Sequence, residues 1–265
     1  MSNYQKITEE LTLLTQSVAN YIASEALLFS SEAIEHKGLN DLVSYVDKTA
    51  EMLLVKGLQQ ILPGAGFITE ENTISQQAND FQWIVDPLDG TTNFIHSLPC
   101  YSISVALMFQ NELVVGVVHE VNRNECFYAW KNGGAFLNGK AISVSNKPTL
   151  QDSLIATGFP YTVFEEIDDY LKLLKELMKC SHGLRRLGSA AVDLAYVACG
   201  RFESYFEYNL NAWDVAAGCL IVKEAGGKVT DFKGENDFVF GRRVVASNQL
   251  THEALLTIIQ ANFKK

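Results

Sequence analysis

Two aspartates, three positions apart, follow a short apolar run in the first half of the chain. The run Trp83–Val85 precedes Asp86 and Asp89, and Pro87 lies between the two acids. Because Pro87 fixes its own φ angle and lacks an amide donor, we expect the chain to bend here and bring both carboxylates toward one point. Adjacent ionised carboxylates repel each other, and a shared proton or a bound cation relieves the repulsion. Magnesium prefers such oxygen ligands, so the pair is a candidate metal site.

A glycine and two threonines come directly after the second acid. Gly90 has no side chain, and Thr91 and Thr92 add two hydroxyls. If a helix begins here, its first backbone N–H groups could bind a phosphate oxygen. The alternative is a surface turn, since Asp-Pro and Asp-Gly are common turn dipeptides. The apolar run before the acids and the hydroxyls after them favour the binding site.

Two acids elsewhere in the chain are candidates for the same centre. Glu70 ends the short apolar run Phe67–Thr69, although that segment alone favours a solvated strand end. Asp214 lies at the start of an apolar segment, where the helix dipole and capping already favour an acid. A metal shell needs more ligands than the first two aspartates supply, and this need favours Glu70 and Asp214 as ligands.

Helices and strands must position these residues. Apolar residues recur every three or four positions over roughly the first thirty residues and again from about Val43 to Ile61, which predicts two amphipathic helices. Asp47 lies near the first turn of the second helix. Short β-branched runs predict strands at 66–68, 83–85, 103–107, 113–118, 126–129, 153–157, 184–187, 204–207, 228–231 and 244–246. Further helices are predicted at 164–178, 189–198, 213–224 and the carboxyl end.

This order of elements favours two α/β layers stacked side by side over a barrel. The second half alternates strand and helix, and the seam is expected near Ser145–Gln151, which divides residues 1–150 from residues 151–265. The first part would hold most of the metal ligands, and the second would supply Asp214 and the substrate pocket. The two parts are expected to share an interface and to form one compact unit.

Composition excludes some classes of function. Acidic residues outnumber basic ones by 31 to 21, and the formal charge of -10 argues against nucleic acid as a partner. An anionic substrate would then need a local positive charge, for which a metal cation is the obvious source. Five cysteines without CxxC spacing predict reduced thiols, and the absence of a signal-peptide pattern or a long apolar run predicts a cytoplasmic protein without a membrane segment. Arg185 and Arg186 could stabilise a dimer contact or the edge of the substrate, although a solvated pair is the expectation.

The run from Trp83 to Phe94, WIVDPLDGTTNF, resembles the first signature of the inositol monophosphatase family, and the run from Trp213 to Gly227 resembles the second. The similarity covers nearly the whole chain and includes Phe67–Glu71, Arg186–Ala191, Arg242–Asn248 and a bacterial-type stretch at Gly200–Glu207. The resemblance implies an α/β (α+β) fold, a layered α-β-α-β-α sandwich of the sugar phosphatase type, and a homodimer.

The same resemblance implies the metal ligands. Glu70, Asp86 and the backbone carbonyl of Leu88 would hold one magnesium ion, and Asp86, Asp89 and Asp214 would hold a second. A third, weaker ion would lie beside Glu70. Manganese could replace magnesium, whereas calcium or lithium would inhibit. A metal-activated water would attack phosphorus, so no phospho-enzyme is expected.

The resemblance also implies roles for other residues. Thr91, paired with Asp47, would orient the attacking water together with Glu70. Substrate-binding residues would be Gly90, Thr91, Ser189, Ala190, Glu207 and Asp214. Lys37 resembles a family lysine near the active-site loop, although an exposed lysine is equally consistent with its segment.

The leading hypothesis is a phosphomonoesterase acting on inositol-1-phosphate or a similar polyol phosphate, because Glu207 is retained. The segment Tyr208–Ala212 departs from the animal inositol monophosphatases. A nucleotide bisphosphate, fructose-1,6-bisphosphate or histidinol phosphate therefore remains an alternative substrate. An alternative of another class is a regulatory binding protein with secondary phosphatase activity.

Overall fold

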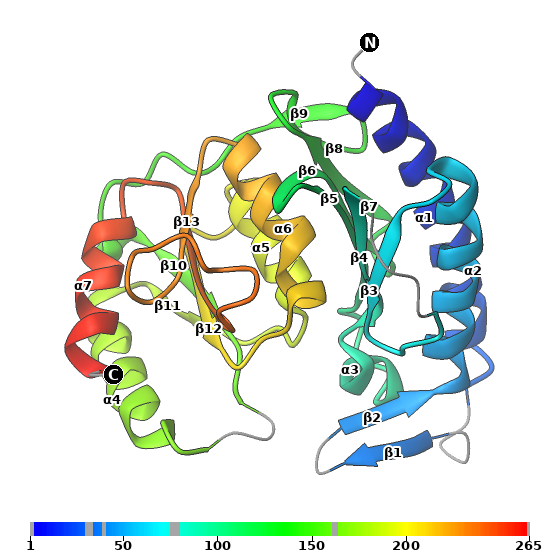
Figure 1. Cartoon of the computed structure of the whole chain (residues 1–265). Coiled ribbons are helices and arrows are strands. Elements are labelled where there is room, and N and C mark those ends of the chain that lie inside the picture. The colour runs from blue at the N-terminus through cyan, green and yellow to red at the C-terminus, as the bar shows by residue number, and fades with distance from the viewer. Residues whose placement is uncertain (1–2, 30–33, 39–40, 75–79, 161–163, 264–265) are drawn as a thin grey trace.

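The computed structural model describes residues 3–29, 34–38, 41–74, 80–160 and 164–263. Its layers follow the order α-β-α-β-α (Figure 1), which confirms the sandwich implied by the sequence. From the amino-terminal side the layers are helices α1 (Asn3–Ala26) and α2 (Tyr45–Ile61), a seven-stranded sheet, helices α5 (Ala190–Ala198) and α6 (Ala212–Glu224), a five-stranded sheet, and helices α4 (Ile167–Cys180) and α7 (His252–Asn262).

The seven-stranded sheet runs in sequence order from β3 to β9, and only β3 and β4 pair in parallel. Its strands are β3 (Gly66–Thr69), β4 (Phe81–Asp89), β5 (Ser102–Phe109), β6 (Glu112–Glu120), β7 (Glu125–Trp130), β8 (Gly134–Leu137) and β9 (Lys140–Ile142). The turn between β5 and β6 has positive φ at both Gln110 and Asn111, the conformation that a tight hairpin requires. Strand β5 is buried along almost its whole length because helices cover both faces of the sheet.

The five-stranded sheet has the order β11-β10-β12-β14-β13. Its strands are β10 (Leu154–Thr157), β11 (Gly183–Arg185), β12 (Ser204–Tyr208), β13 (Lys228–Thr230) and β14 (Arg243–Ser247). All strands of the first sheet precede all strands of this one in the chain, and the predicted seam lies between them. The division into two domains stays a prediction.

Helix α6 joins the two sheets. It is apolar around most of its circumference, as expected for a helix that is buried on all sides. A Cβ atom on Gly116 of β6 would lie 2.8 Å from the carbonyl oxygen of Ala217, and one on Gly218 would lie 2.5 Å from Leu194 of α5. The absence of side chains at these two glycines therefore lets α6 approach both β6 and α5.

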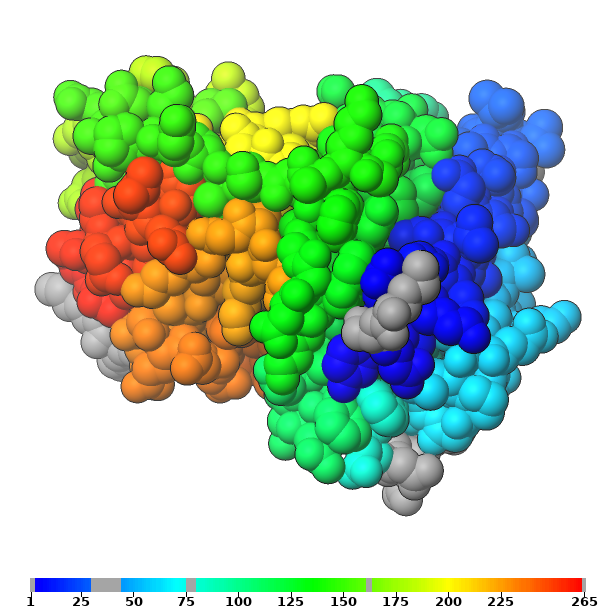
Figure 2. Space-filling view, turned by 90° about the horizontal axis from the view of Figure 1, so that it is seen from above, coloured from blue at the N-terminus to red at the C-terminus, as the bar shows by residue number. Residues whose placement is uncertain are grey.

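The view from above shows the same arrangement on the surface. In Figure 2 the green surface of the middle of the chain separates the blue surface of α1 from the orange and red surfaces of the carboxyl-terminal part. None of the helices in the described part of the chain combines the length and the apolar character that crossing a bilayer requires. All five cysteines are free thiols, as the sequence predicted.

Two local features differ from the sequence-based expectation, and a third decides between two alternatives. A hairpin of β1 (Ile34–Gly38) and β2 (Asp41–Ser44) precedes α2, so that helix begins at Tyr45. Strand β4 does not end before the acids but continues to Asp89, with an irregular register between Asp86 and Asp89. The short helix α3 (Thr91–Ile95) begins immediately after Gly90, where the sequence left a helix start and a surface turn as alternatives.

Candidate active site

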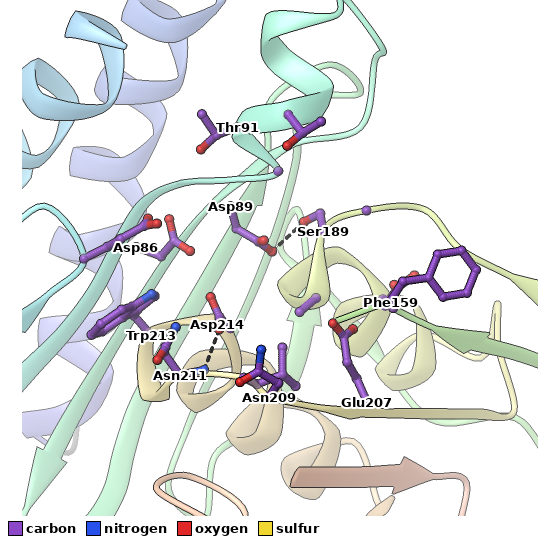
Figure 3. Close-up of a pocket in the computed structure, with 18 of the residues that line it drawn as sticks. Asp86, Asp89, Thr91, Phe159, Ser189, Glu207, Asn209, Asn211, Trp213 and Asp214 are labelled. Atoms are coloured by element: carbon purple, nitrogen blue, oxygen red, sulfur yellow. Dashed lines mark hydrogen bonds between the residues drawn. The ribbon is translucent and has the colours of Figure 1, made fainter. Parts of the chain in front are cut away.

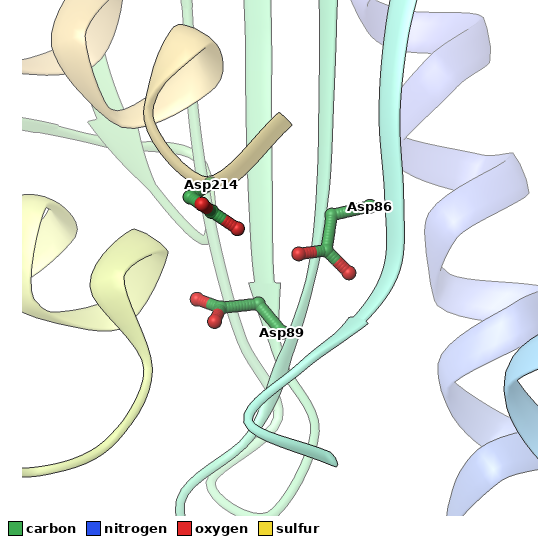
Figure 4. A group of neighbouring side chains, drawn as sticks. All are labelled: Asp86, Asp89 and Asp214. Carbon is green, nitrogen blue, oxygen red and sulfur yellow. The ribbon is translucent and has the colours of Figure 1, made fainter. Parts of the chain in front are cut away.

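Three aspartates converge where β4 meets the first turn of α6. Asp86 and Asp89 come from β4 and Asp214 from α6, and one carboxylate oxygen of each lies within 4.8 Å of those of the other two (Figure 4). In a regular strand, residues three positions apart point to opposite faces. The irregular register between Asp86 and Asp89 alters this alternation, which lets both side chains face Asp214.

Backbone and hydroxyl donors orient these carboxylates. Asp89 Oδ2 accepts hydrogen bonds from Ser189 Oγ and from the Ala191 N–H, each at 2.7 Å. Asp214 Oδ2 accepts one from the Asn211 N–H at 2.6 Å, at the start of α6. The start of α5 thus orients Asp89, and the start of α6 orients Asp214 (Figure 3).

The cluster is poorly solvated and strongly acidic. Burial raises the pKa of Asp89 to about 6 and, together with the negative charge of Asp89, raises the pKa of Asp214 to about 7. Burial, followed by the charges of Glu70, Asp89 and Asp214, also raises the pKa of Asp86. Three carboxylates that repel one another, Asp86 buried and Asp89 and Asp214 half-buried, form a donor set for a hard divalent cation such as Mg²⁺, which favours their ionised form.

Glu70 lies at the end of β3, beside Asp86. Its N–H donates to the carbonyl oxygen of Val85 at 3.2 Å, which extends the parallel pairing of β3 with β4. Glu70 and Asp86 line the same cavity, but Glu70 is not one of the three residues whose oxygens all lie within 4.8 Å of one another. This placement suits an ion at the edge of the cluster.

The segment after Asp89 places a hydroxyl beside the cluster. Gly90 has a φ of 97°, and a Cβ atom there would lie 3.0 Å from the carbonyl oxygen of Cys100. The Thr91 hydroxyl lies 2.9 Å from Asp47 Oδ1 and 3.0 Å from the Leu88 carbonyl oxygen. Asp47 is fully buried behind Thr91, and its burial raises the pKa of its carboxyl group.

The carboxylates lie in a cavity of about 440 Å³ whose opposite wall comes from the second half of the chain (Figure 3). Ser189, Ala190 and Glu207 belong to that wall. Glu207 accepts a hydrogen bond from the Tyr205 hydroxyl at 2.7 Å, and burial raises the pKa of Glu207 to about 8. The cavity is lined by every site residue predicted from the sequence except Asp47.

Some lining residues were not predicted from the sequence. Arg186, for which a solvated pair was the expectation and the edge of the substrate an alternative, is half-buried in the cavity wall, whereas Arg185 is exposed. Asp193 is almost completely buried at the cavity, and a single acid within the apolar segment AAVDLAYVA was the signal that could have identified it. Phe159 also lines the cavity and has no motif around it. The side chain of Lys37 lies outside the described part of the structure.

Comparison with known proteins supports the family resemblance that the sequence indicated. The model of the inositol monophosphatase family matches residues 3–263. The putative Nus factor SuhB of Neisseria meningitidis is 43% identical over 86% of this chain and 88% of its own length. An inositol-1-monophosphatase of Mesorhizobium japonicum is 40% identical over 84% of this chain and 85% of its own. The crystal structure of SuhB from Bartonella henselae superposes with a TM-score of 0.91 at 36% identity and covers 96% of this chain and 98% of that one.

Other similar structures contain ligands. A dual-specificity inositol monophosphatase and NADP phosphatase has been solved with D-inositol-1-phosphate, at a TM-score of 0.84, 25% identity and coverage of 98% of this chain and 97% of that one. Structures are also known of an inositol monophosphatase/NADP phosphatase with Mg²⁺ and phosphate and of a staphylococcal inositol monophosphatase in a lithium-soaked inhibitory complex.

Proposed function

The chain belongs to the inositol monophosphatase family, and from this premise we propose that it is a magnesium-dependent phosphomonoesterase acting on inositol-1-phosphate or a similar polyol phosphate. The observation that carries the proposal is the convergence of Asp86, Asp89 and Asp214 in one cavity with Glu207 on its opposite wall. Relatives solved with Mg²⁺ and phosphate and with lithium support magnesium as the cofactor and lithium as an inhibitor.

The proposed ligands are Glu70, Asp86, the Leu88 carbonyl, Asp89 and Asp214. Bound divalent cations would supply an activated water and would neutralise charge on the phosphate as the ester bond breaks. The chain's own residues fix the geometry: Ser189 and the Ala191 N–H hold Asp89, and the Asn211 N–H holds Asp214. Because these donors are in place before the substrate arrives, little rearrangement is needed for the reaction.

Thr91 is proposed to orient the attacking water. Its single hydroxyl hydrogen points to Asp47 or to the Leu88 carbonyl, so its oxygen lone pairs can accept a hydrogen bond from water. The N–H groups of Gly90 and Thr91, at the start of α3, are proposed to donate to phosphate oxygens.

Glu207 is proposed to bind the alcohol part of the substrate. A carboxyl group whose pKa is about 8 is mostly protonated near neutral pH, so it can both donate and accept a hydrogen bond. A polyol offers hydroxyl groups with the same two capacities.

A panel of phosphate esters tests the proposal. Phosphate release should be measured with inositol-1-phosphate, fructose-1,6-bisphosphate, histidinol phosphate and a nucleotide bisphosphate, with Mg²⁺ and with EDTA. We expect release to require Mg²⁺ and kcat/KM to be highest for inositol-1-phosphate. A higher kcat/KM for a bisphosphate would overturn the substrate assignment, and release that is unaffected by EDTA would overturn the metal-dependent mechanism.

A second candidate function is regulatory, because several relatives at 40% identity or more are described as Nus factor SuhB. In that case the phosphatase activity would be secondary. The Asp214→Asn variant separates the two functions: if it is inactive but restores the phenotype of a deletion strain, the regulatory function is supported. Failure to restore the phenotype, with normal expression, would support the enzymatic function.

A further inference from the structure

Helix α2 carries a second buried acid that the proposed chemistry does not use. Glu51 lies four residues after Asp47, on the same face of the helix, and its side chain is fully buried. Glu51 Oε2 accepts a hydrogen bond from the Glu71 N–H at 2.7 Å. Glu51 Oε1 accepts two more, from the N–H of Thr73 at 2.8 Å and from its hydroxyl at 2.7 Å.

These bonds hold the chain segment that directly follows Glu70. In a β-strand, consecutive N–H groups point to opposite sides, and Glu70 directly follows the last residue of β3. Accordingly, the Glu70 N–H donates to Val85 of β4, whereas the next N–H, that of Glu71, donates to Glu51 of α2. The backbone at Glu70 is therefore fixed between β4 on one side and α2 on the other, which restricts the direction of the Glu70 side chain.

Burial of Glu51 has a structural explanation as well. A buried carboxylate with three donors is satisfied, and its removal would leave two backbone N–H groups without an acceptor. If this were the only role of Glu51, its replacement would lower the stability of the fold and change nothing else. The placement of Glu51 goes further, because the segment that it binds begins one residue after a proposed metal ligand.

We propose that Glu51 is a positioning residue for the metal site, which holds Glu70 beside Asp86 and thereby sets the affinity for the cation next to Glu70. The inference rests on the proposed metal-dependent function. With Asp47 bound to Thr91 and Glu51 bound to residues 71 and 73, one face of α2 holds two separate segments of the site.

The test is a binding titration of the full chain with Mn²⁺, in which free Mn²⁺ is followed by electron paramagnetic resonance. We compare the parent protein with Glu51→Gln, Glu70→Gln and the double variant. Gln keeps one acceptor oxygen but turns an NH₂ group toward a backbone donor. We expect E51Q to weaken one class of Mn²⁺ sites by about tenfold, the loss typical of residues that orient metal ligands. The double variant should bind no more weakly than E70Q, because Glu51 acts through Glu70.

A matched control isolates this effect from a loss of stability. Glu203 is also buried and accepts one hydroxyl and one backbone N–H, from Ser145 and Leu154, away from the cavity. Glu203→Gln should lower the melting temperature without changing Mn²⁺ affinity. If E51Q does not fold, Thr73→Val removes only the hydroxyl bond and should weaken Mn²⁺ binding by about threefold.

The outcomes separate the inference from the proposed function. Parent-like Mn²⁺ binding by E51Q, or by T73V where E51Q does not fold, would overturn the inference while a weakened E70Q still supports the role of Glu70. Parent-like binding by E70Q would overturn the ligand role of Glu70 and the inference with it. Additive losses in the double variant would show that Glu51 acts independently of Glu70.

Discussion

At the scale of single residues, the site depends on carboxylates whose charge is costly without a cation. Asp89 receives two hydrogen bonds from the start of α5, yet burial still raises its pKa to about 6. A carboxyl group whose pKa is raised by burial, and whose orientation is nevertheless fixed by hydrogen bonds, is typical of a functional site.

Replacing Asp89 with Asn should remove the negative charge of a proposed metal ligand and keep the shape of the side chain. We expect kcat to fall by about 10²–10³-fold, as for the loss of one group that stabilises the transition state. The Mg²⁺-induced rise in melting temperature should also become smaller. The measurements are steady-state phosphate release and thermal unfolding with and without Mg²⁺. Asp231→Asn is the matched control, because Asp231 is also buried and accepts two backbone N–H groups on a distant turn.

The Thr91 hydroxyl should affect the chemical step more than substrate binding. Thr91→Val removes the group that lies 2.9 Å from Asp47 and preserves the side-chain volume. We expect kcat to fall by about a hundredfold with KM little changed. Thr91→Ser restores the hydroxyl and should recover most of the activity. Equal losses in both variants would mean that packing, and not the hydroxyl, accounts for the effect.

At the scale of elements, short turns and helix starts bring the residues together. Gly90 adopts positive φ in a tight space, between β4 and α3, where a side chain would meet backbone atoms. Gly139 also has positive φ, but a Cβ atom there would have no neighbour within 4 Å. Substitutions at the two glycines can therefore be compared to distinguish the effect of backbone strain from that of a steric clash.

Gly90→Ala should lower the free energy of unfolding by about 1 kcal/mol more than Gly139→Ala, since only the former adds a steric clash. Both variants would share the cost of positive φ for a residue with a Cβ atom. Urea unfolding measures the difference. Gly90→Ala should also lose phosphatase activity, whereas activity at the parent level would show that the shape of this turn is not required.

The sequence predicted most elements because each had a clear local pattern. The apolar period of α1 and the β-branched runs of β5 and β6 are examples, and their bounds agree closely with the structure. The hairpin of β1 and β2 lacks an apolar alternation and was missed. Extension of β4 through Pro87 was missed as well, because Pro87 indicates a turn by local rules, whereas pairing with β5 keeps the chain in the sheet.

Local sequence patterns alone would not have predicted that these site residues lie together. The two signature runs supplied Asp86, Asp89 and Asp214, and the structure places them in one cluster. Their roles as ligands stay predictions. Asp193 was missed because its place at the cavity depends on how α5 packs against β12, which a single sequence does not encode as a short motif.

At the scale of the whole molecule, stability should depend on pH through the metal site. The pKa of Asp89 and Asp214 is raised in the folded protein, so without metal the folded state binds more protons than the unfolded state between about pH 4 and pH 7. These two groups therefore lower stability as the pH rises through that range. A bound cation favours their ionised forms and opposes the loss.

The Mg²⁺-induced rise in melting temperature should consequently be larger at pH 8 than at pH 5. The measurement is thermal unfolding with Mg²⁺ and with EDTA at each of the two pH values. The difference between the two melting temperatures at one pH cancels the contribution of titrating groups far from the site. Asp214→Asn should reduce the dependence on pH. An equal rise at both pH values would mean that these carboxylates do not bind the ion.

Helix α6 has one more consequence for the molecule as a whole. It carries Asp214 in its first turn, belongs to the later part of the chain, and packs against β5 and β6 of the earlier part. Neither half expressed as a separate fragment would retain all three aspartates, and the earlier sheet would expose the apolar face that α6 covers. We therefore expect the proposed activity to require the complete sandwich, so truncation at the seam should yield two insoluble, inactive pieces.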